Sequence, residues 1–454
     1  DHEEWQDIIL DRAKSMFERD KNHTAILIWS CGNESCGGKD LYEMSEYFRH
    51  ADPTRLVHYE NIFWDRRYNG TSDMESQMYP PVADIKKFLA EHRDKPFICC
   101  EYTHAMGNSI GGMHKYTDLT DEEPLYQGGF IWDFVDQAIW HKDRYGKDAY
   151  GYGGDFGDRP NDGNFSGDGI LFADRSLTTK MQEVKFNYQN FTLAVEADKV
   201  TIHNKSLFTN VSEYELYLTV QLDGEKIWED HRYAPDIKPG ESGEVALEDL
   251  PITGAGEETV TASLRLKEDT LWAKQGFEVA FGQGTWQVDE VEVPEPQAIV
   301  EAAELRNDTR EFHYTPNMPL ETRPEKPLHI VHGDINLGVR GVGFEIMFSS
   351  AFGNLTSYKY NGVELIEEAP KPSFWRAPVD NDYGSRRDFA VAQWKLASLY
   401  RRCIKKELMD EEGNWQEFDW FGQLGQREYD ASFIKLRFTY ELATQPVAIC
   451  SVTY

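Results

Sequence analysis

The first 132 residues alternate two kinds of apolar segment, and this alternation limits the fold more than any other feature of the sequence. Short aliphatic and aromatic runs bounded by turn residues predict buried strands, and between them apolar residues recur at the spacing of a helical face. The predicted strands are 25–30, 55–59, a short segment that ends at 77–79, 96–100 and 128–132. The predicted helices are 3–19, 41–48, 85–89 and a segment near 110–119. Strands that alternate with helices predict parallel βαβ units.

Five strands are too few to close a βα barrel, which needs eight. Either the five strands form an open sheet, or three barrel strands precede Asp1. The sequence starts at Asp1, without Met and already inside a helical pattern. This start favours a barrel whose first strands lie upstream.

Two glutamates stand at the ends of two predicted strands: Glu34 follows 25–30, and Glu101 follows 96–100. An acidic residue at the carboxyl end of a buried strand is misplaced for a core but well placed for chemistry in a βα barrel. One such glutamate alone is more often a helix cap or half of a salt bridge. Two in matching positions, each within an aromatic and amide-rich run, favour the carboxylate pair that cleaves a glycosidic bond.

A retaining glycosidase needs one carboxyl to protonate the leaving oxygen and another to attack the sugar, so the two need different environments. Asn33, beside Glu34, can donate to a sugar hydroxyl. Tyr79 and His104 can supply hydrogen bonds near Glu101, and Trp132 can form a stacking floor. Each of these residues, taken alone, is more often structural.

From about residue 190 the apolar period changes to two, which predicts β-sandwiches. Asp223-Gly224 and Asn361-Gly362 are expected hairpin turns. The segment 287–327 is rich in Glu and Pro and is expected to be a linker. The chain ends on an apparent strand, so we also expect its last domain to be truncated. The predicted domains are 1–186, the βα units; 187–286, a β-sandwich; 287–327, the linker; and 328–454, a second β-sandwich.

Composition excludes several classes of function. The formal charge of −32 argues against nucleic acid and anionic membranes, because both need a basic face. The sequence contains no run of 18 apolar residues, so it predicts no membrane span. The six cysteines form neither a CxxC or Cys/His metal pattern nor a disulfide framework.

Several long runs make a family resemblance visible. They are 28–35 (IWSCGNES), 100–109 (CEYTHAMGNS), 127–133 (QGGFIWD), 152–158 (YGGDFGD), 169–175 (GILFADR) and 374–382 (FWRAPVDND). In these runs the chain resembles the large bacterial β-galactosidases of glycoside hydrolase family 2, and the likeness spans nearly its whole length. It implies a multidomain α/β plus all-β fold. The expected order is the last five βα units of a (β/α)8 TIM barrel, an Ig-like β-sandwich, and part of a larger, galactose-mutarotase-like β-sandwich.

The resemblance also implies roles for individual residues. Glu34 matches the general acid/base, which is also a Mg²⁺ ligand, and Glu101 matches the nucleophile. Asn33 matches the amide beside the acid/base, and Tyr79 the tyrosine hydrogen-bonded near the nucleophile. The remaining matches are His104 as a galactose-binding histidine and Trp132 as the aromatic platform under the sugar.

Three further positions match metal ligands in the family. Asn161 matches a ligand of a second, peripheral Mg²⁺. Phe165, through its carbonyl, and Asp168 match ligands of a monovalent cation, Na⁺ or K⁺, that also touches the sugar. The best-known member has Asn where this chain has Asp168. The family's other ligands of the catalytic Mg²⁺, a Glu and a His, lie on an earlier barrel strand, outside this sequence.

The leading hypothesis is therefore a retaining β-galactosidase that acts on β-galactosides. We expect a cytoplasmic enzyme, with a periplasmic location as the alternative. We also expect it to assemble as a homodimer or homotetramer. Another family 2 activity, β-glucuronidase or β-mannosidase, is the close rival. The segment Trp375-Arg376-Ala377-Pro378 favours the galactosidase, because the rivals generally lack its domain. A non-catalytic fragment that binds carbohydrate is the alternative from another class.

Overall fold

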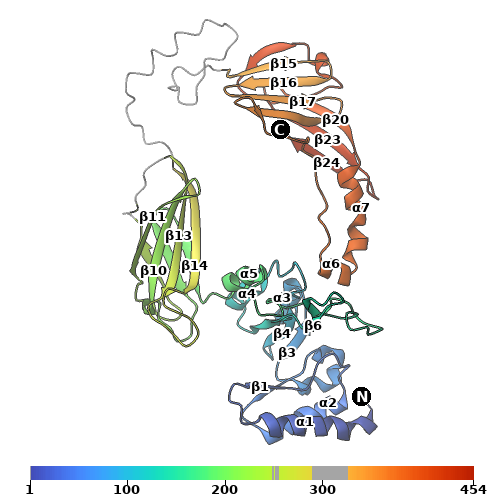
Figure 1. Cartoon of the computed structure of the whole chain (residues 1–454), viewed down its shortest axis with the longest axis vertical. Helices are drawn as coiled ribbons and strands as arrows, with labels where there is room; N and C mark the ends of the chain where they lie inside the picture. Colours follow the sequence, from blue (N-terminus) through green and yellow to red (C-terminus); the bar gives the residue numbers. More distant parts are fainter. Residues whose placement is uncertain (1, 248–249, 251–254, 289–325) are drawn as a thin grey trace. The chain divides into compact units, whose positions relative to one another are not determined.

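The computed structural model describes residues 2–247, 250, 255–288 and 326–454 (Figure 1). The chain divides into two compact units, Asp1–Val293 and Pro294–Tyr454. The predicted linker 287–327 falls almost wholly outside the described residues, and residues 287 and 288 end strand β14. None of the helices within the described ranges is long and apolar enough to cross a membrane.

The first unit begins with βα units, and the five predicted strands are all present. They are β1 (Ile28–Ser30), β2 (Leu56–His58), β3 (Glu75–Met78), β4 (Phe97–Tyr102) and β5 (Tyr126–Ile131). The helices between and before them are α1 (Gln6–Asp20), α2 (Lys39–Ala51), α3 (Val82–Glu91) and α4 (His114–Glu122). Strands β1 and β2 pair in parallel, and β3, β4 and β5 form a second parallel sheet.

The apolar faces of these helices pack on the strands. The indole of Trp29 on β1 stacks on Phe48 of α2, with ring centroids 5.6 Å apart. Ile85 of α3, Phe97 of β4 and Leu119 of α4 are fully buried in one cluster. Burying a side chain of this size contributes roughly 1.5–3 kcal/mol to the free energy of unfolding. The apolar helix faces predicted from the sequence therefore stabilise the βα units.

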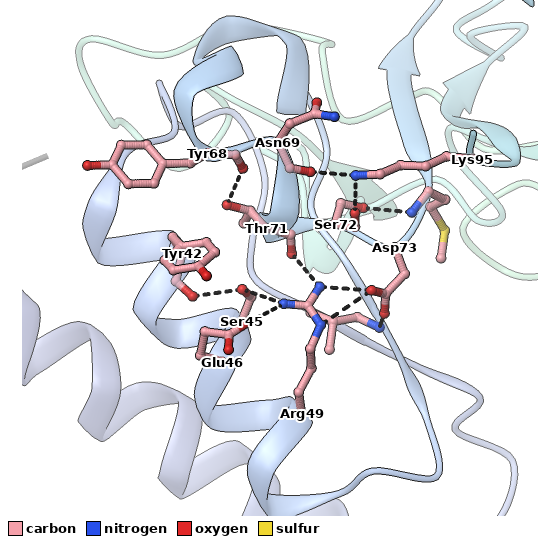
Figure 2. Close-up of polar contacts among 12 residues, drawn as sticks. Tyr42, Ser45, Glu46, Arg49, Tyr68, Asn69, Thr71, Ser72, Asp73 and Lys95 are labelled. Atoms are coloured by element: carbon pink, nitrogen blue, oxygen red, sulfur yellow. Dashed lines mark hydrogen bonds and ion pairs between the residues drawn. The ribbon is translucent and has the colours of Figure 1, made fainter. Parts of the chain in front are cut away.

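A polar network lies where β2, β3 and β4 begin (Figure 2). Arg49 of α2 donates two hydrogen bonds to the Asp73 carboxylate, at 2.9 and 3.3 Å. The other oxygen of Asp73 accepts the backbone N–H of Val57, which lies on β2, at 2.7 Å. Lys95, just before β4, donates to the carbonyls of Asn69 and Ser72. Opposite charges and paired donors thus join the amino-terminal ends of three strands.

The βα segment ends with elements that the sequence analysis did not predict. A hairpin of β6 (Ile139–Lys142) and β7 (Asp148–Gly151) follows β5, and α5 (Lys180–Asn187) leads into the first sandwich. Lys185 of α5 forms an ion pair with Glu278 at 2.9 Å, and Gln189 hydrogen-bonds the backbone of Phe281. These contacts attach the sandwich to the βα segment.

Among the described residues, seven antiparallel strands form the first sandwich. Its sheets are β11-β10-β13-β14 and β12-β9-β8. The strands are β8 (Phe191–Val195), β9 (Lys199–Asn204), β10 (Tyr214–Leu222), β11 (Glu225–Tyr233), β12 (Ser242–Ala246), β13 (Gly256–Leu266) and β14 (Glu278–Val288). Asp223 and Gly224 both have positive φ, at 49° and 84°, as expected for a tight hairpin turn.

The second unit contains two antiparallel sheets, β19-β18-β17-β16-β15-β22 and β21-β20-β23-β24. The strands are β15 (Leu328–His332), β16 (Asn336–Gly341), β17 (Phe344–Ser349), β18 (Asn354–Tyr360), β19 (Val363–Glu364), β20 (Arg401–Met409), β21 (Trp415–Glu417), β22 (Glu428–Ala431), β23 (Leu436–Leu442) and β24 (Ile449–Thr453). The expected turn at Asn361-Gly362 joins β18 to β19. Two helices, α6 (Asp380–Gly384) and α7 (Arg387–Leu399), were not predicted.

Candidate active site

Strained backbone gathers at the carboxyl-terminal edge of the βα strands. Glu34 follows β1, Asn61 follows β2, Tyr79 follows β3 and Thr103 follows β4, and their φ angles lie between 48° and 52°. A residue other than glycine in this left-handed region costs roughly 1–3 kcal/mol, and it persists only where surrounding contacts impose it. Such strain clusters at functional sites, so this edge is a candidate active site.

Glu101, on β4, is held by Tyr79. The Tyr79 hydroxyl donates to Glu101 Oε2 at 2.6 Å, and the Tyr79 backbone N–H donates to the Glu101 carbonyl at 2.8 Å. Burial raises the pKa of the Glu101 carboxyl above its ordinary value; the Tyr79 hydrogen bond opposes that rise, and the charge of Glu34 adds to it. The hydroxyl therefore favours the ionised carboxylate, which is the form that can attack a sugar carbon.

Glu34 lies in the exposed loop that follows β1, directly after Asn33. Its backbone N–H donates to Oε1 of Glu60, a glutamate at the end of β2. Burial is the largest cause of a raised pKa at Glu60, and the charges of Glu34 and Glu101 act in the same direction. Three carboxyls from three strand ends are therefore electrostatic neighbours.

Aromatic rings lie beside this group. The ring of His104 stands edge-on to Tyr79, with centroids 5.9 Å apart, and it stacks on Phe165 at 5.8 Å. His104 follows β4, whereas Phe165 lies more than 60 residues along the chain, so tertiary folding brings them together. Tyr79, Phe165 and Trp132 are all partly exposed, and exposed aromatic rings can stack on a sugar.

Trp132 and Asp168 form the second polar contact of the site. The indole N–H of Trp132 donates to Asp168 Oδ2 at 2.8 Å, and the Asp133 N–H donates to the Asp168 carbonyl at 2.7 Å. Asp168 is buried, and its Oδ1 has no hydrogen-bond partner. An unpartnered buried carboxylate oxygen is costly, and a bound cation would relieve that cost. Asp168 thus fits the cation ligand that the resemblance implies.

The described residues do not provide a full set of Mg²⁺ ligands. Among the described residues, no three His, Cys, Asp or Glu side chains lie close enough together to hold a metal ion. Asn161 is occupied by its own turn, where its amide donates to the Asp158 carbonyl at 2.9 Å and accepts the Gly163 N–H at 3.0 Å. Glu34 is exposed and could contribute one oxygen to a catalytic Mg²⁺.

The structure thus brings Glu34, Glu101, Tyr79 and His104 into one neighbourhood, and it pairs Trp132 with Asp168. Glu60 is not among the residues predicted for the site. Its signal was available, because Glu60 follows the predicted strand 55–59 just as Glu101 follows 96–100. The same rule for acidic residues at strand ends would have found it.

Comparison with known proteins now defines the class. A model described as "Glycosyl hydrolases family 2, TIM barrel domain" matches residues 1–193, so the βα units are a TIM-barrel segment of a glycoside hydrolase. Models described as "Beta-galactosidase, domain 4" and "Beta galactosidase small chain" match residues 200–287 and 340–454. The chain belongs to glycoside hydrolase family 2. The predicted fold class, a TIM-barrel segment followed by β-sandwiches, is confirmed.

Individual relatives share much of the sequence. The chain is 45% identical over 417 residues to a β-galactosidase of Halalkalibacterium halodurans, in a match that covers 91% of this chain and 38% of the relative. It is 42% identical over 451 residues to a β-galactosidase of Clostridium acetobutylicum, in a match that covers 99% of this chain and 45% of the relative. The chain therefore spans less than half the length of these two relatives.

Proposed function

We propose that the protein that carries this chain is a retaining β-galactosidase, which removes terminal non-reducing β-D-galactose from β-galactosides. The observation that carries the proposal is the Tyr79–Glu101 hydrogen bond beside Glu34 at the carboxyl edge of the βα strands. The names of the relatives and of two of the three matching models support the same substrate class.

The chemistry is a double displacement. A Glu101 carboxylate oxygen attacks the anomeric carbon and the glycosidic bond breaks, while the Glu34 carboxyl gives its proton to the leaving oxygen. The resulting galactosyl-enzyme is an ester of Glu101. Glu34, now ionised, takes a proton from water as the water oxygen attacks the same carbon and the bond from that carbon to Glu101 breaks. Galactose leaves with its configuration retained, and both carboxyls return to their starting states.

The surrounding side chains hold the sugar and the nucleophile. Tyr79 fixes the orientation of Glu101 through its hydroxyl. We propose that Asn33 and His104 hydrogen-bond sugar hydroxyls, and that the exposed face of Trp132 stacks under the ring. The hydrogen bond to Asp168 fixes the Trp132 indole, so its face is ready before substrate arrives.

We also propose two metal dependences. Glu34 would hold Mg²⁺ together with ligands from outside this chain, and Asn161 would hold a peripheral Mg²⁺. Asp168 and the Phe165 carbonyl would hold a monovalent cation, Na⁺ or K⁺, supported by the unpartnered Asp168 Oδ1. A cation there neutralises local negative charge and can hold a sugar oxygen. Exhaustive EDTA treatment should lower activity, and an enzyme insensitive to it would contradict the Mg²⁺ proposal.

We propose a cytoplasmic enzyme that assembles as a homodimer or homotetramer and does not bind nucleic acid. The charge of −32 supports the absence of nucleic-acid binding. Light scattering of the purified protein tests the assembly, and a monomeric mass would contradict it.

A panel of nitrophenyl β-glycosides tests the substrate class. We expect hydrolysis of the galactoside and little or none of the glucuronide or mannoside. Preference for either of the latter would indicate one of the other family 2 activities. A wild-type protein that binds galactosides but hydrolyses none of the panel would indicate a carbohydrate-binding function instead.

A further inference from the structure

Glu60 is a buried carboxylate with no assigned role. It follows β2 and has only 1% of its surface exposed. A buried carboxylate is costly unless hydrogen bonds replace the lost water. Its two oxygens contact a backbone N–H and a thiol, and these groups belong to the two segments that carry the catalytic glutamates.

The first contact fixes the loop of the acid/base. The Glu34 N–H donates to Glu60 Oε1. Glu34 has a φ of 52°, a strained conformation that a non-glycine residue keeps only where its surroundings impose it. A hydrogen bond from N–H to a carboxylate is roughly twice as strong as a neutral one, so Glu60 supplies a contact suited to holding this backbone.

The second contact reaches the strand of the nucleophile. Cys100 Sγ lies 3.9 Å from Glu60 Oε2, and Cys100 directly precedes Glu101 on β4. The Glu60 carboxylate therefore contacts the backbone of Glu34, the proposed acid/base, and the side chain of Cys100, which precedes the proposed nucleophile. Nothing in the sequence links these two segments, which are 66 residues apart.

We propose that Glu60 is a positioning residue that sets the placement of Glu34 relative to Glu101. This inference rests on the proposed function. A retaining enzyme needs its two carboxyls about 5 Å apart, and an error of about 1 Å in placing a reacting group can cost roughly 100-fold in rate. A residue that contacts both segments is well placed to control that separation.

A pair of variants of similar size tests the proposal. Glu60→Gln keeps an oxygen that can accept the Glu34 N–H, whereas Glu60→Met fills the space without an acceptor. With phenyl galactoside, a poor leaving group, we expect Glu60→Met to lower kcat about 10- to 100-fold with little change in KM. Glu60→Gln should stay within about threefold of the wild type, so the conservative variant rescues the rate.

Azide separates a positioning role from a general loss of folding. Dinitrophenyl galactoside needs no proton for its leaving group, and azide attacks the galactosyl-enzyme without a base. Azide should therefore accelerate the Glu60→Met variant and form galactosyl azide, with the bond to Glu101 broken and its carboxylate released. It should not accelerate Glu60→Gln.

The matched control is Glu75→Gln, because Glu75 is another buried carboxyl, 3% exposed, and is paired with Arg66 at the start of β3. It should lower thermal stability and leave the ratio of the two substrates' rates unchanged. A Glu60→Gln variant as slow as Glu60→Met, or a Glu60→Met variant that azide fails to accelerate, would overturn the proposal. If Glu60→Met does not fold, a loss above about tenfold in Glu60→Gln overturns it, and a smaller loss supports it.

The outcome for the wild type separates this inference from the proposed function. A wild-type protein that cleaves no galactoside refutes the function itself. The same pair of variants is then compared on the glycoside that the wild type does cleave, and the same ratio of rates decides the role of Glu60.

Discussion

The two ends of the same βα strands differ in whether their charged and polar groups are paired with partners of opposite charge. At the amino-terminal edge, Arg49 meets Asp73, and Lys95 meets two backbone carbonyls, so charge is balanced and donors are paired (Figure 2). At the carboxyl-terminal edge, Glu34, Glu60 and Glu101 bring like charges together.

The backbone shows the same contrast. Among residues 2–132, five residues other than glycine have left-handed conformations. Glu34, Asn61, Tyr79 and Thr103 follow the carboxyl ends of β1 to β4, and Ile110 lies in the loop between β4 and α4. Unfavourable charge and strained backbone therefore occur at the end where barrel enzymes carry their chemistry, and the satisfied network occurs at the end that supplies stability. Mutations at the two ends should separate activity from stability.

The largest expected effect is at the carboxyl edge. Glu101→Gln should lower kcat by at least about 10³-fold, because the amide cannot form the galactosyl ester. Its free energy of unfolding should be unchanged or raised, since one of three neighbouring negative charges is removed. Steady-state kinetics and denaturant unfolding measure the two quantities. Near-wild-type turnover would refute the nucleophile assignment.

The opposite result is expected at the amino edge. Arg49→Met should lower the free energy of unfolding by about 3 kcal/mol, because it removes both hydrogen bonds to Asp73 and leaves that carboxylate without its cation. The kcat of the folded fraction should not change. Glu46→Gln is the control, since Glu46 touches the same guanidinium from a side chain 48% exposed and should cost less than about 0.5 kcal/mol. A large loss of kcat in Arg49→Met would break the contrast between the edges.

Tyr79→Phe should have a smaller effect on catalysis. Losing a hydrogen bond to a charged group costs about 2 kcal/mol, so kcat/KM should fall roughly 10- to 100-fold. The hydroxyl stabilises the ionised form of Glu101, so its loss raises the pKa of that carboxyl. The acid limb of the pH profile of kcat/KM should move to higher pH, and a shift to lower pH would contradict this role.

The smallest expected effect concerns Asp52, just before β2. Hydrogen bonds from Thr54 and Trp29 lower the pKa of Asp52 from 3.8 to about 2. The folded state then binds fewer protons than the unfolded state between these values, so stability is present above pH 4 and is lost as pH falls toward 2. The difference between wild type and Asp52→Asn should shrink by about 1 kcal/mol over this range in urea titrations. A constant difference would show that Asp52 does not contribute to the pH dependence.

Local patterns predicted much of the fold. The five βα strands, the hairpin at Asp223-Gly224 and the turn at Asn361-Gly362 all formed where the sequence indicated. The helix expected near 110–119 begins only at His114, because Ile110 and Gly112 adopt positive φ angles that a helix cannot include. Helix α7 was missed because its apolar residues do not gather on one buried face, and only Ala397 is buried.

The sequence by itself determined which segments become strands and helices, and it placed a glutamate at the ends of two strands. These outcomes depend on neighbours a few residues away, which apolar period and turn residues encode. The tertiary structure alone decided that Glu60 touches both catalytic segments, that Trp132 pairs with Asp168, and that Arg49 meets Asp73. Each of these contacts joins residues at least 24 positions apart, so it exists only once the strands have packed side by side.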